Sequence, residues 1–173
     1  MKTSESEPKP LVVEVLTRSH DRVGFASGVE PLDRYLTAQA LQDKRRRVTV
    51  PYVLVYQGDN AILGYYTLSS TAVRLDALPD EIARRLPCYP NVPATLLGRL
   101  AIDRRHHGLG FGGNLLLNAL RRAAAAAEEV ASVAVIVDAK DDAASAFYRR
   151  FGFRAFQDDP FRLFLSMAEI RKV

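Results

Sequence analysis

Four glycines follow a basic stretch at the point where a helix is expected to begin. Gly108, Gly110 and Gly113 form the pattern G-x-G-x-x-G, and Gly112 lies between the last two. Glycine leaves the backbone amides at a helix start accessible, and the helix dipole adds roughly half a positive charge there. The natural ligand of such a loop is a phosphate or a pyrophosphate.

Three kinds of phosphate-binding loop compete for this pattern. A P-loop needs Lys and Ser or Thr after its last glycine, and Asn114 stands there instead, which excludes it. A dinucleotide-binding loop matches the glycines, and Asp138 lies near the position of its acidic residue. However, "DRRHH" separates the first glycine from the strand, and too little chain follows to complete that sheet. The third pattern, R-x-x-G-x-G, starts at Arg105 directly after an apolar strand.

The surrounding elements predict an α+β fold. Hydrophobic patterning predicts strands over residues 11–17, 48–57, 61–73, 95–103, 132–139, 153–157 and 161–167. It predicts helices over residues 31–47, 78–86, 110–130 and 141–151. "GDN" at 58–60 indicates a hairpin, and Gly152 is a candidate helix C-cap. We expect a mixed, mostly antiparallel sheet flanked by helices, with one βαβ crossover in the C-terminal half.

Composition limits the class of protein. The chain has 173 residues, 48% hydrophobic and 25% charged, which predicts one domain over residues 11–173 behind a flexible, polar lead-in over residues 1–10. No apolar run approaches the ~20 residues of a membrane span, and the start lacks the apolar centre of a signal peptide. Cys88 is the single cysteine, which excludes an intrachain disulfide and a cysteine-rich metal site. We therefore expect a cytoplasmic protein with no membrane association.

Basic residues gather in short clusters. The net charge is +4, and the clusters are Lys44–Arg47, Arg104–His107, Arg121 with Arg122, and Arg149 with Arg150. One cluster alone is usually a solvated face, but several together favour an anionic ligand or partner. Two adjacent histidines, His106 and His107, make a poor metal site without a third ligand, so we expect no metal.

The chain resembles the GNAT family of N-acetyltransferases. "RHHGLG" matches that family's acetyl-CoA loop, and "DDAASAFYRRFGF" matches its second motif through Ala144, Phe147, Tyr148 and the closing Gly-Phe pair. Asp141 departs from the family's usual asparagine, which puts a side-chain hydrogen bond near the cofactor in doubt. The resemblance implies acetyl-CoA as donor and a splayed strand that pairs with its pantetheine arm. The cofactor-binding residues it implies are Leu100, Ala101, Ile102, Arg105, Gly108, Gly110, Phe111, Gly112, Gly113, Ala144 and Tyr148.

Acetyl transfer from a thioester sets the roles. The backbone amides of Leu100–Ile102 are the candidate donors to the developing oxyanion. Tyr148 is the candidate general acid toward the departing thiolate, with a buried structural tyrosine as the alternative interpretation. Glu30, Asp33, Asp76 and Asp80 lie in loops or helix starts, so no carboxylate stands out as general base. This favours an acceptor α-amine, which titrates near ~8, over a lysine amine near ~10.4.

One branch of the family is closer still. "GFASGVEPLDRYLTAQA", "LGRLAIDRRHHGLGFGG" and "DDPFRLFLSM" resemble the TacT-like acetyltransferase toxins, with Ser27 where the branch often has cysteine. The resemblance implies acetylation of the amino group of aminoacyl-tRNA, which stops translation. It also implies a ribbon-helix-helix antitoxin, a homodimer, and DNA contact only through the antitoxin complex.

The basic clusters supply candidates for tRNA phosphate contacts. They are Lys44, Arg45, Arg46, Arg47, Arg99, Arg149 and Arg150. Two other functions stay open on the sequence. One is an N-acetyltransferase for a small amine, a polyamine or a protein, and the other is a non-catalytic module that binds acetyl-CoA.

Overall fold

The computed structural model of the chain describes residues 7–172. It contains two compact units, each built from two stretches distant in sequence. The first unit comprises the chain up to Tyr65 together with Ala101–Leu115, and the second comprises Tyr66–Leu100 and the chain from Leu116 onward. Among the described residues, seven strands hydrogen-bond in the order β1-β2-β3-β4-β5-β7-β6. Residues 1–6 of the predicted lead-in lie outside the described residues.

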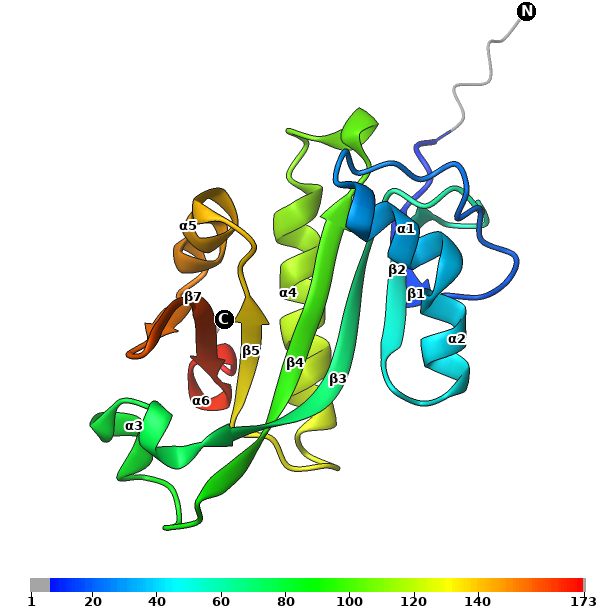
Figure 1. The fold of residues 1–173 in the computed structure, drawn as a ribbon. Coiled ribbons are helices and arrows are strands. Elements are labelled where there is room, and N and C mark those ends of the chain that lie inside the picture. Colours follow the sequence, from blue (N-terminus) through cyan, green and yellow to red (C-terminus); the bar gives the residue numbers. More distant parts are fainter. Residues whose placement is uncertain (1–6, 173) are drawn as a thin grey trace, which may run out of the picture. The chain divides into compact units, whose positions relative to one another are not determined.

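The first unit is built on an antiparallel pair of strands. β1 (Leu11–Val15) pairs with β2 (Val50–Tyr56), from Leu11 opposite Tyr56 to Val15 opposite Tyr52. Two short helices, α1 (Glu30–Ala38) and α2 (Ala40–Arg45), connect these strands and lie beside β2 in Figure 1. The single helix predicted over residues 31–47 is therefore wrong, because the chain turns at Gln39. The turn leaves Leu36 and Ala40, on either side of it, both fully buried.

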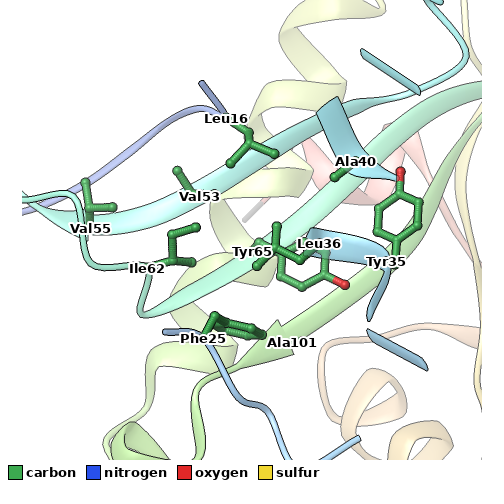
Figure 2. Close-up of a cluster of buried hydrophobic side chains, with 10 residues drawn as sticks. All are labelled: Leu16, Phe25, Tyr35, Leu36, Ala40, Val53, Val55, Ile62, Tyr65 and Ala101. Atoms are coloured by element: carbon green, nitrogen blue, oxygen red, sulfur yellow. The ribbon is translucent and has the colours of Figure 1, made fainter. Parts of the chain in front are cut away.

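Aromatic and aliphatic side chains fill the core of the first unit (Figure 2). Tyr65 lies at its centre, with the ring of Phe25 edge-on at 5.6 Å and the ring of Tyr35 stacked at 6.4 Å. The Tyr65 hydroxyl donates a 2.7 Å hydrogen bond to the carbonyl of Leu32. Burial of such rings is the main source of stability in a core of this size. The contacts fix α1 and the segment before it against the strands.

The second unit carries the parallel crossover. β4 (Asn91–Ile102) and β5 (Ala134–Asp138) are parallel neighbours, joined through α4 (Phe111–Ala126). β5 pairs antiparallel with β7 (Asp159–Ser166), which pairs with β6 (Arg154–Phe156). The predicted mixed sheet with a C-terminal βαβ crossover is confirmed.

Shorter elements complete the description. Tyr66 to Arg74, the larger part of β3 (Gly64–Arg74), belongs to the second unit with η1 (Leu75–Ala77), α3 (Asp80–Ala83) and α5 (Asp142–Arg150). α6 (Met167–Ile170) was not predicted, although Ser166 and Glu169 form the capping box that starts it. β4 starts inside the proline-spaced loop, earlier than predicted, because Val92 and Ala94 are buried in the second core. Along residues 7–172, the helices are all too short or too polar to cross a bilayer.

Candidate functional site

The glycine loop has the backbone geometry of an anion site. Gly108 and Gly110 have φ of +78° and +79°, a left-handed conformation that other residues adopt at a cost of about 1–2 kcal/mol. α4 begins directly after them, and the amide of Asn114 donates to the carbonyl of Gly110 at 3.2 Å. The amides of Phe111, Gly112 and Gly113 precede that bond in the first helical turn. This geometry suits a diphosphate.

A buried carboxylate anchors the start of this loop. The side chain of Asp103 is fully buried and accepts four hydrogen bonds. Its Oδ1 accepts from the backbone amide and the Nε of Arg105, both at 2.9 Å. Its Oδ2 accepts from the Arg105 Nη2 at 3.0 Å and from the Ala26 amide at 3.1 Å. Asp103 therefore ties the end of β4 to the segment that precedes α1.

Electrostatics show the strength of this anchor. The Arg105 guanidinium, hydrogen-bonded to Asp103, holds the pKa of that carboxyl well below its usual range against the opposing effect of burial. Arg105 also donates from Nη2 to the carbonyl of Gly24 at 3.2 Å. The family resemblance implies that Arg105 binds the cofactor. In the structure its guanidinium faces Asp103 and Gly24, so it holds the loop through these partners.

The two histidines brace the same loop. In η2 (Arg104–His106), the ring of His106 stacks on Phe111 with centroids 5.8 Å apart. His107 places its Nε2 2.8 Å from the carbonyl oxygen of Ile102, a distance at which the ring nitrogen donates. Within residues 7–172, no three His, Cys, Asp or Glu side chains gather where they could hold a metal ion.

β4 continues beyond its pairing with β5. Their ladder joins Thr95 to Val135, Leu96 to Ile136 and Leu97 to Val137. β4 then runs on to Ile102, while β5 ends at Asp138. The last residues of β4, from 98 to 102, thus extend beyond this ladder. A strand that outruns its neighbour leaves backbone groups for an extended ligand, as the predicted pantetheine arm requires.

α5 carries the candidate general acid. Asp141 caps the helix, since its Oδ1 accepts from the Ala144 amide at 2.8 Å, and this bond lowers the pKa of Asp141. The aspartate at the usual asparagine position therefore supplies the same kind of cap. Tyr148 lies one turn after Ala144 and is 8% exposed, with its ring edge-on to Phe147 at 5.2 Å and to Phe153 at 5.5 Å.

The Tyr148 hydroxyl is held in its protonated form. Burial raises the pKa of Tyr148 to about 12. None of the described residues forms a hydrogen bond with this hydroxyl, unlike the core hydroxyls of Tyr35, Tyr65 and Tyr66. The hydroxyl oxygen is not among the fully buried polar atoms without a partner in the described chain, so it reaches the surface, where a ligand atom or water can bond to it.

The predicted tRNA contacts are divided between the units. Lys44 is half-buried on α2, and Arg45, Arg46 and Arg47 are exposed after it, all in the first unit. Arg99 is half-buried on β4, and Arg149 and Arg150 end α5, in the second unit. Arg149 donates to the Ser145 hydroxyl at 3.2 Å, and Arg150 lies over the Phe147 ring at 5.8 Å. Four of the seven residues thus belong to the first unit and three to the second.

Sequence reasoning missed two polar groups near the loop. Asp103 was treated as the end of an apolar strand, although an acid at that position followed by two arginines could have signalled a buried pair. Asp33 accepts from both the hydroxyl and the amide of Ser27, at 2.6 and 2.8 Å. Ser27, which stands where the TacT-like branch often has cysteine, thus has a polar role in ordering the segment before α1.

Comparison with known proteins places the fold in a family. Residues 51–155 match the model of the acetyltransferase (GNAT) domain. The chain belongs to the GNAT family of acetyltransferases. This confirms the predicted family, fold and enzyme class, and it excludes the dinucleotide-binding interpretation of the glycines.

Relatives within the GNAT family are toxins. The chain is 35% identical over 156 residues to a protein of Mycobacterium tuberculosis named tRNA-acetylating toxin, covering 90% of this chain and 92% of that protein. It is 27% identical over 172 residues to a probable toxin TacT of Sinorhizobium fredii, covering 95% of each.

Solved structures agree with this grouping. AtaT complexed with acetyl-methionyl-tRNAfMet matches with a TM-score of 0.88 and 30% identity, over 94% of this chain and 98% of that one. AtaTR bound with acetyl-CoA matches with a TM-score of 0.81 and 30% identity, over 94% and 96%. A KacTA–DNA complex matches with a TM-score of 0.75 and 30% identity, over 94% and 97%.

Proposed function

We propose that this protein transfers an acetyl group from acetyl-CoA to the α-amino group of aminoacyl-tRNA and thereby blocks translation. The observation that carries the proposal is the near full-length similarity to AtaT, a structure of which holds acetyl-methionyl-tRNA. The named tRNA-acetylating relative, equally long in its coverage, supports it. The two units together would form one N-acetyltransferase domain over residues 11–173, since the family match draws on both.

The glycine loop is the proposed holder of the coenzyme. Acetyl-CoA supplies the acetyl group as a thioester, and its diphosphate would lie against the amides of Phe111–Gly113. Gly108 and Gly110 let the backbone turn toward it, and Asp103 with Arg105 keeps the turn in place. The backbone of Leu100–Ile102 would pair with the extended arm and donate hydrogen bonds to the carbonyl oxygen as it gains negative charge. Ala144, one turn before Tyr148, would contact the coenzyme at the start of α5.

Tyr148 is the proposed general acid. Its raised pKa keeps the phenol protonated at every physiological pH, so a donor is always present for the departing sulfur. A thiol titrates near ~8.5, so complete proton transfer from this phenol to a thiolate is uphill. The phenol would therefore stabilise the departing sulfur by a hydrogen bond, and a proton that it passes to the thiolate would be replaced by the proton that the amine loses on forming the amide.

The acceptor amine must already be deprotonated when it binds. Three of the acids considered as bases are already engaged: Glu30 with Arg34, Asp33 with Ser27, and Asp76 with Arg74 at 2.5 Å. An ammonium acceptor would find no ready proton acceptor among them. The α-amine of an aminoacyl ester titrates near ~8 and so offers far more free base at neutral pH than a lysine amine near ~10.4, which matches this site.

The proposal extends to partners. Among the related structures, AtaT is bound to the C-terminus of the antitoxin AtaR, and KacTA is in a complex with DNA. For this chain we propose a ribbon-helix-helix antitoxin, contact with DNA only through that complex, a homodimer, and action in the cytoplasm, where charged tRNA is found.

A transfer assay tests the function. Purified protein is incubated with radiolabelled acetyl-CoA and either charged or deacylated total tRNA, and label in precipitated RNA is counted. Label should appear only with charged tRNA. Label on polyamines or proteins, with none on charged tRNA, would overturn the substrate assignment.

A further inference from the structure

A cationic hollow lies in the first unit where α2 meets the end of β1. Its volume is about 310 Å³, and it is lined by Thr17, Arg18, Leu41, Lys44 and Arg45. The Lys44 ammonium donates to the carbonyl of Leu16 at 2.8 Å, which fixes one positive charge at the end of β1. Arg18 and Arg45 are exposed beside it.

A buried histidine orders the turn that carries Arg18. The amide of Thr17 donates to the Nδ1 of His20 at 3.0 Å, so Nδ1 is an acceptor and Nε2 carries the proton. That Nε2 lies 2.7 Å from the carboxylate of Glu14. The amide of His20 donates back to the carbonyl of Thr17 at 3.3 Å. The turn is therefore held from inside the unit, and Arg18 projects from a fixed backbone.

The positive charges of the hollow are not neutralised by ion pairs. Among residues 7–172, neither Arg18 nor Arg45 has a carboxylate partner, whereas the exposed Arg34, Arg74 and Arg171 are each paired with an acid. The acid within α2, Asp43, accepts from the Tyr35 hydroxyl at 3.0 Å instead. Free guanidinium groups beside a fixed ammonium form a site for anions.

Arg47 occupies a position just after α2 where glycine is usually favoured. α2 ends in a Schellman motif, in which the Val48 amide donates to the Asp43 carbonyl at 3.0 Å and the Arg47 amide to the Lys44 carbonyl at 3.1 Å. Arg47, at the C′ position, has φ of +60° and is the one non-glycine residue with positive φ in the described chain. Strained backbone that persists in a protein points to a use for the residue.

We propose that Arg18, Lys44, Arg45 and Arg47 bind phosphodiester groups of the tRNA body. The inference rests on the proposed function and adds a second contact region to it, separate in sequence from the glycine loop and from Tyr148. A nucleic acid fits better than a protein partner, because three of the five side chains that line the hollow are cationic and none is an aromatic anchor of the kind that dominates protein interfaces. Leu41 is its single apolar lining residue, and it is half-buried.

Salt dependence tests the site. The double variant Arg18→Gln/Arg45→Gln removes two charges, and the matched control Arg34→Gln/Arg171→Gln removes two charges that are ion-paired and exposed. Affinity for deacylated tRNA and kcat/KM for charged tRNA are measured from low to moderate salt. Each phosphate contact contributes about 0.7–0.9 to the log–log salt slope. We expect the double variant to lose roughly one to two units of slope and about tenfold in affinity, and the control to lose little.

Two further measurements make the outcome unambiguous. An aminoacylated CCA trinucleotide lacks the tRNA body, so the double variant should acetylate it as the wild type does. Arg47→Gly should raise the Tm, because glycine suits the left-handed backbone, and still weaken tRNA binding severalfold.

The outcomes separate this inference from the proposed function. Equal tRNA affinities and slopes for the double variant and its control would overturn the phosphate site, even if charged tRNA is acetylated. Failure of the wild type to acetylate charged tRNA would overturn the function, while deacylated-tRNA binding would still test the site. Loss of antitoxin binding without any change in tRNA affinity would assign the hollow to a protein partner and also overturn the proposal.

Discussion

Asp103→Asn should destabilise the protein by about 2 kcal/mol and weaken acetyl-CoA binding. The wild-type carboxylate is fully buried, and each oxygen accepts one backbone amide and one nitrogen of the Arg105 guanidinium. An asparagine amide keeps one acceptor oxygen and presents an NH2 group in place of the other. Whichever way it is oriented, the NH2 group faces the amide of Ala26 or of Arg105, so donor meets donor.

The magnitude follows from that mismatch. A buried backbone donor left without an acceptor costs about 1–3 kcal/mol. The guanidinium side of the contact is 65% exposed and can turn to water, so we assign it no energy. A loss of about 2 kcal/mol corresponds to a fall in Tm of about 4–8 °C for a chain of this size. Because η2 starts at Asp103 and leads into the glycine loop, acetyl-CoA binding should weaken as well.

Urea unfolding at two pH values is the assay. The pKa of Asp103 is lower in the folded protein than in the unfolded chain, where it is near ~3.9. Its stabilisation is therefore present above about pH 4 and declines as the pH falls below that value. Asparagine does not titrate, so the stability difference between wild type and variant should be largest at pH 7 and smaller at pH 3.

A matched control isolates the buried anchor. Asp59→Asn removes an exposed ion pair, in which Asp59 lies 2.6 Å from Lys9, and its effect should stay below about 0.5 kcal/mol. The reasoning is refuted if Asp103→Asn is as stable as the control. A difference from wild type that stays constant between pH 7 and pH 3 would also contradict it.

Three other predictions concern catalysis and the loop. Tyr148→Phe should lower kcat by about 10²–10³ with the acetyl-CoA Kd from calorimetry unchanged, whereas unchanged kcat would remove Tyr148 from the chemistry. Gly110→Ala should weaken acetyl-CoA binding about fivefold or more, since alanine is strained at φ of +79°. The control Gly58→Ala, strained at φ of +82° in the hairpin, should lower the Tm without changing that Kd. The pH profile of kcat/KM should rise as the acceptor amine loses its proton near ~8 and should show no descending limb below about pH 11, because the pKa of Tyr148 is about 12. A descending limb near pH 10 would mean that the phenol titrates normally.

The local parts of the site could be predicted from the sequence. Glycines before a helix determine a backbone conformation over a few residues, and the structure confirms positive φ at Gly108 and Gly110. The crossover from β4 through α4 to β5 followed from hydrophobic patterning in the same way. Asp141 could be placed at the start of α5, where its side chain caps the helix.

Contacts between distant segments could not be predicted. Asp103 accepts from Ala26, a residue that no spacing rule connects with it, so the anchored role of Arg105 was missed. The turn at Gln39 contains neither proline nor glycine, so no local signal predicts it. It depends on the packing of Leu36 and Ala40 in one core. The hollow beside α2 could not be predicted either. The carbonyl of Leu16, just after β1, meets the Lys44 ammonium only in the folded chain.

The central claim is that acetyl is transferred to the α-nitrogen of an aminoacyl-tRNA. The most direct measurement is mass spectrometry of the 3′-terminal aminoacyl-adenosine, released by nuclease from charged tRNA after incubation with the protein and acetyl-CoA. We expect a gain of one acetyl mass on the aminoacyl group, with fragmentation placing it on the α-nitrogen, and little gain with Tyr148→Phe. An unmodified aminoacyl-adenosine from every charged tRNA, with a protein that binds acetyl-CoA, would contradict it.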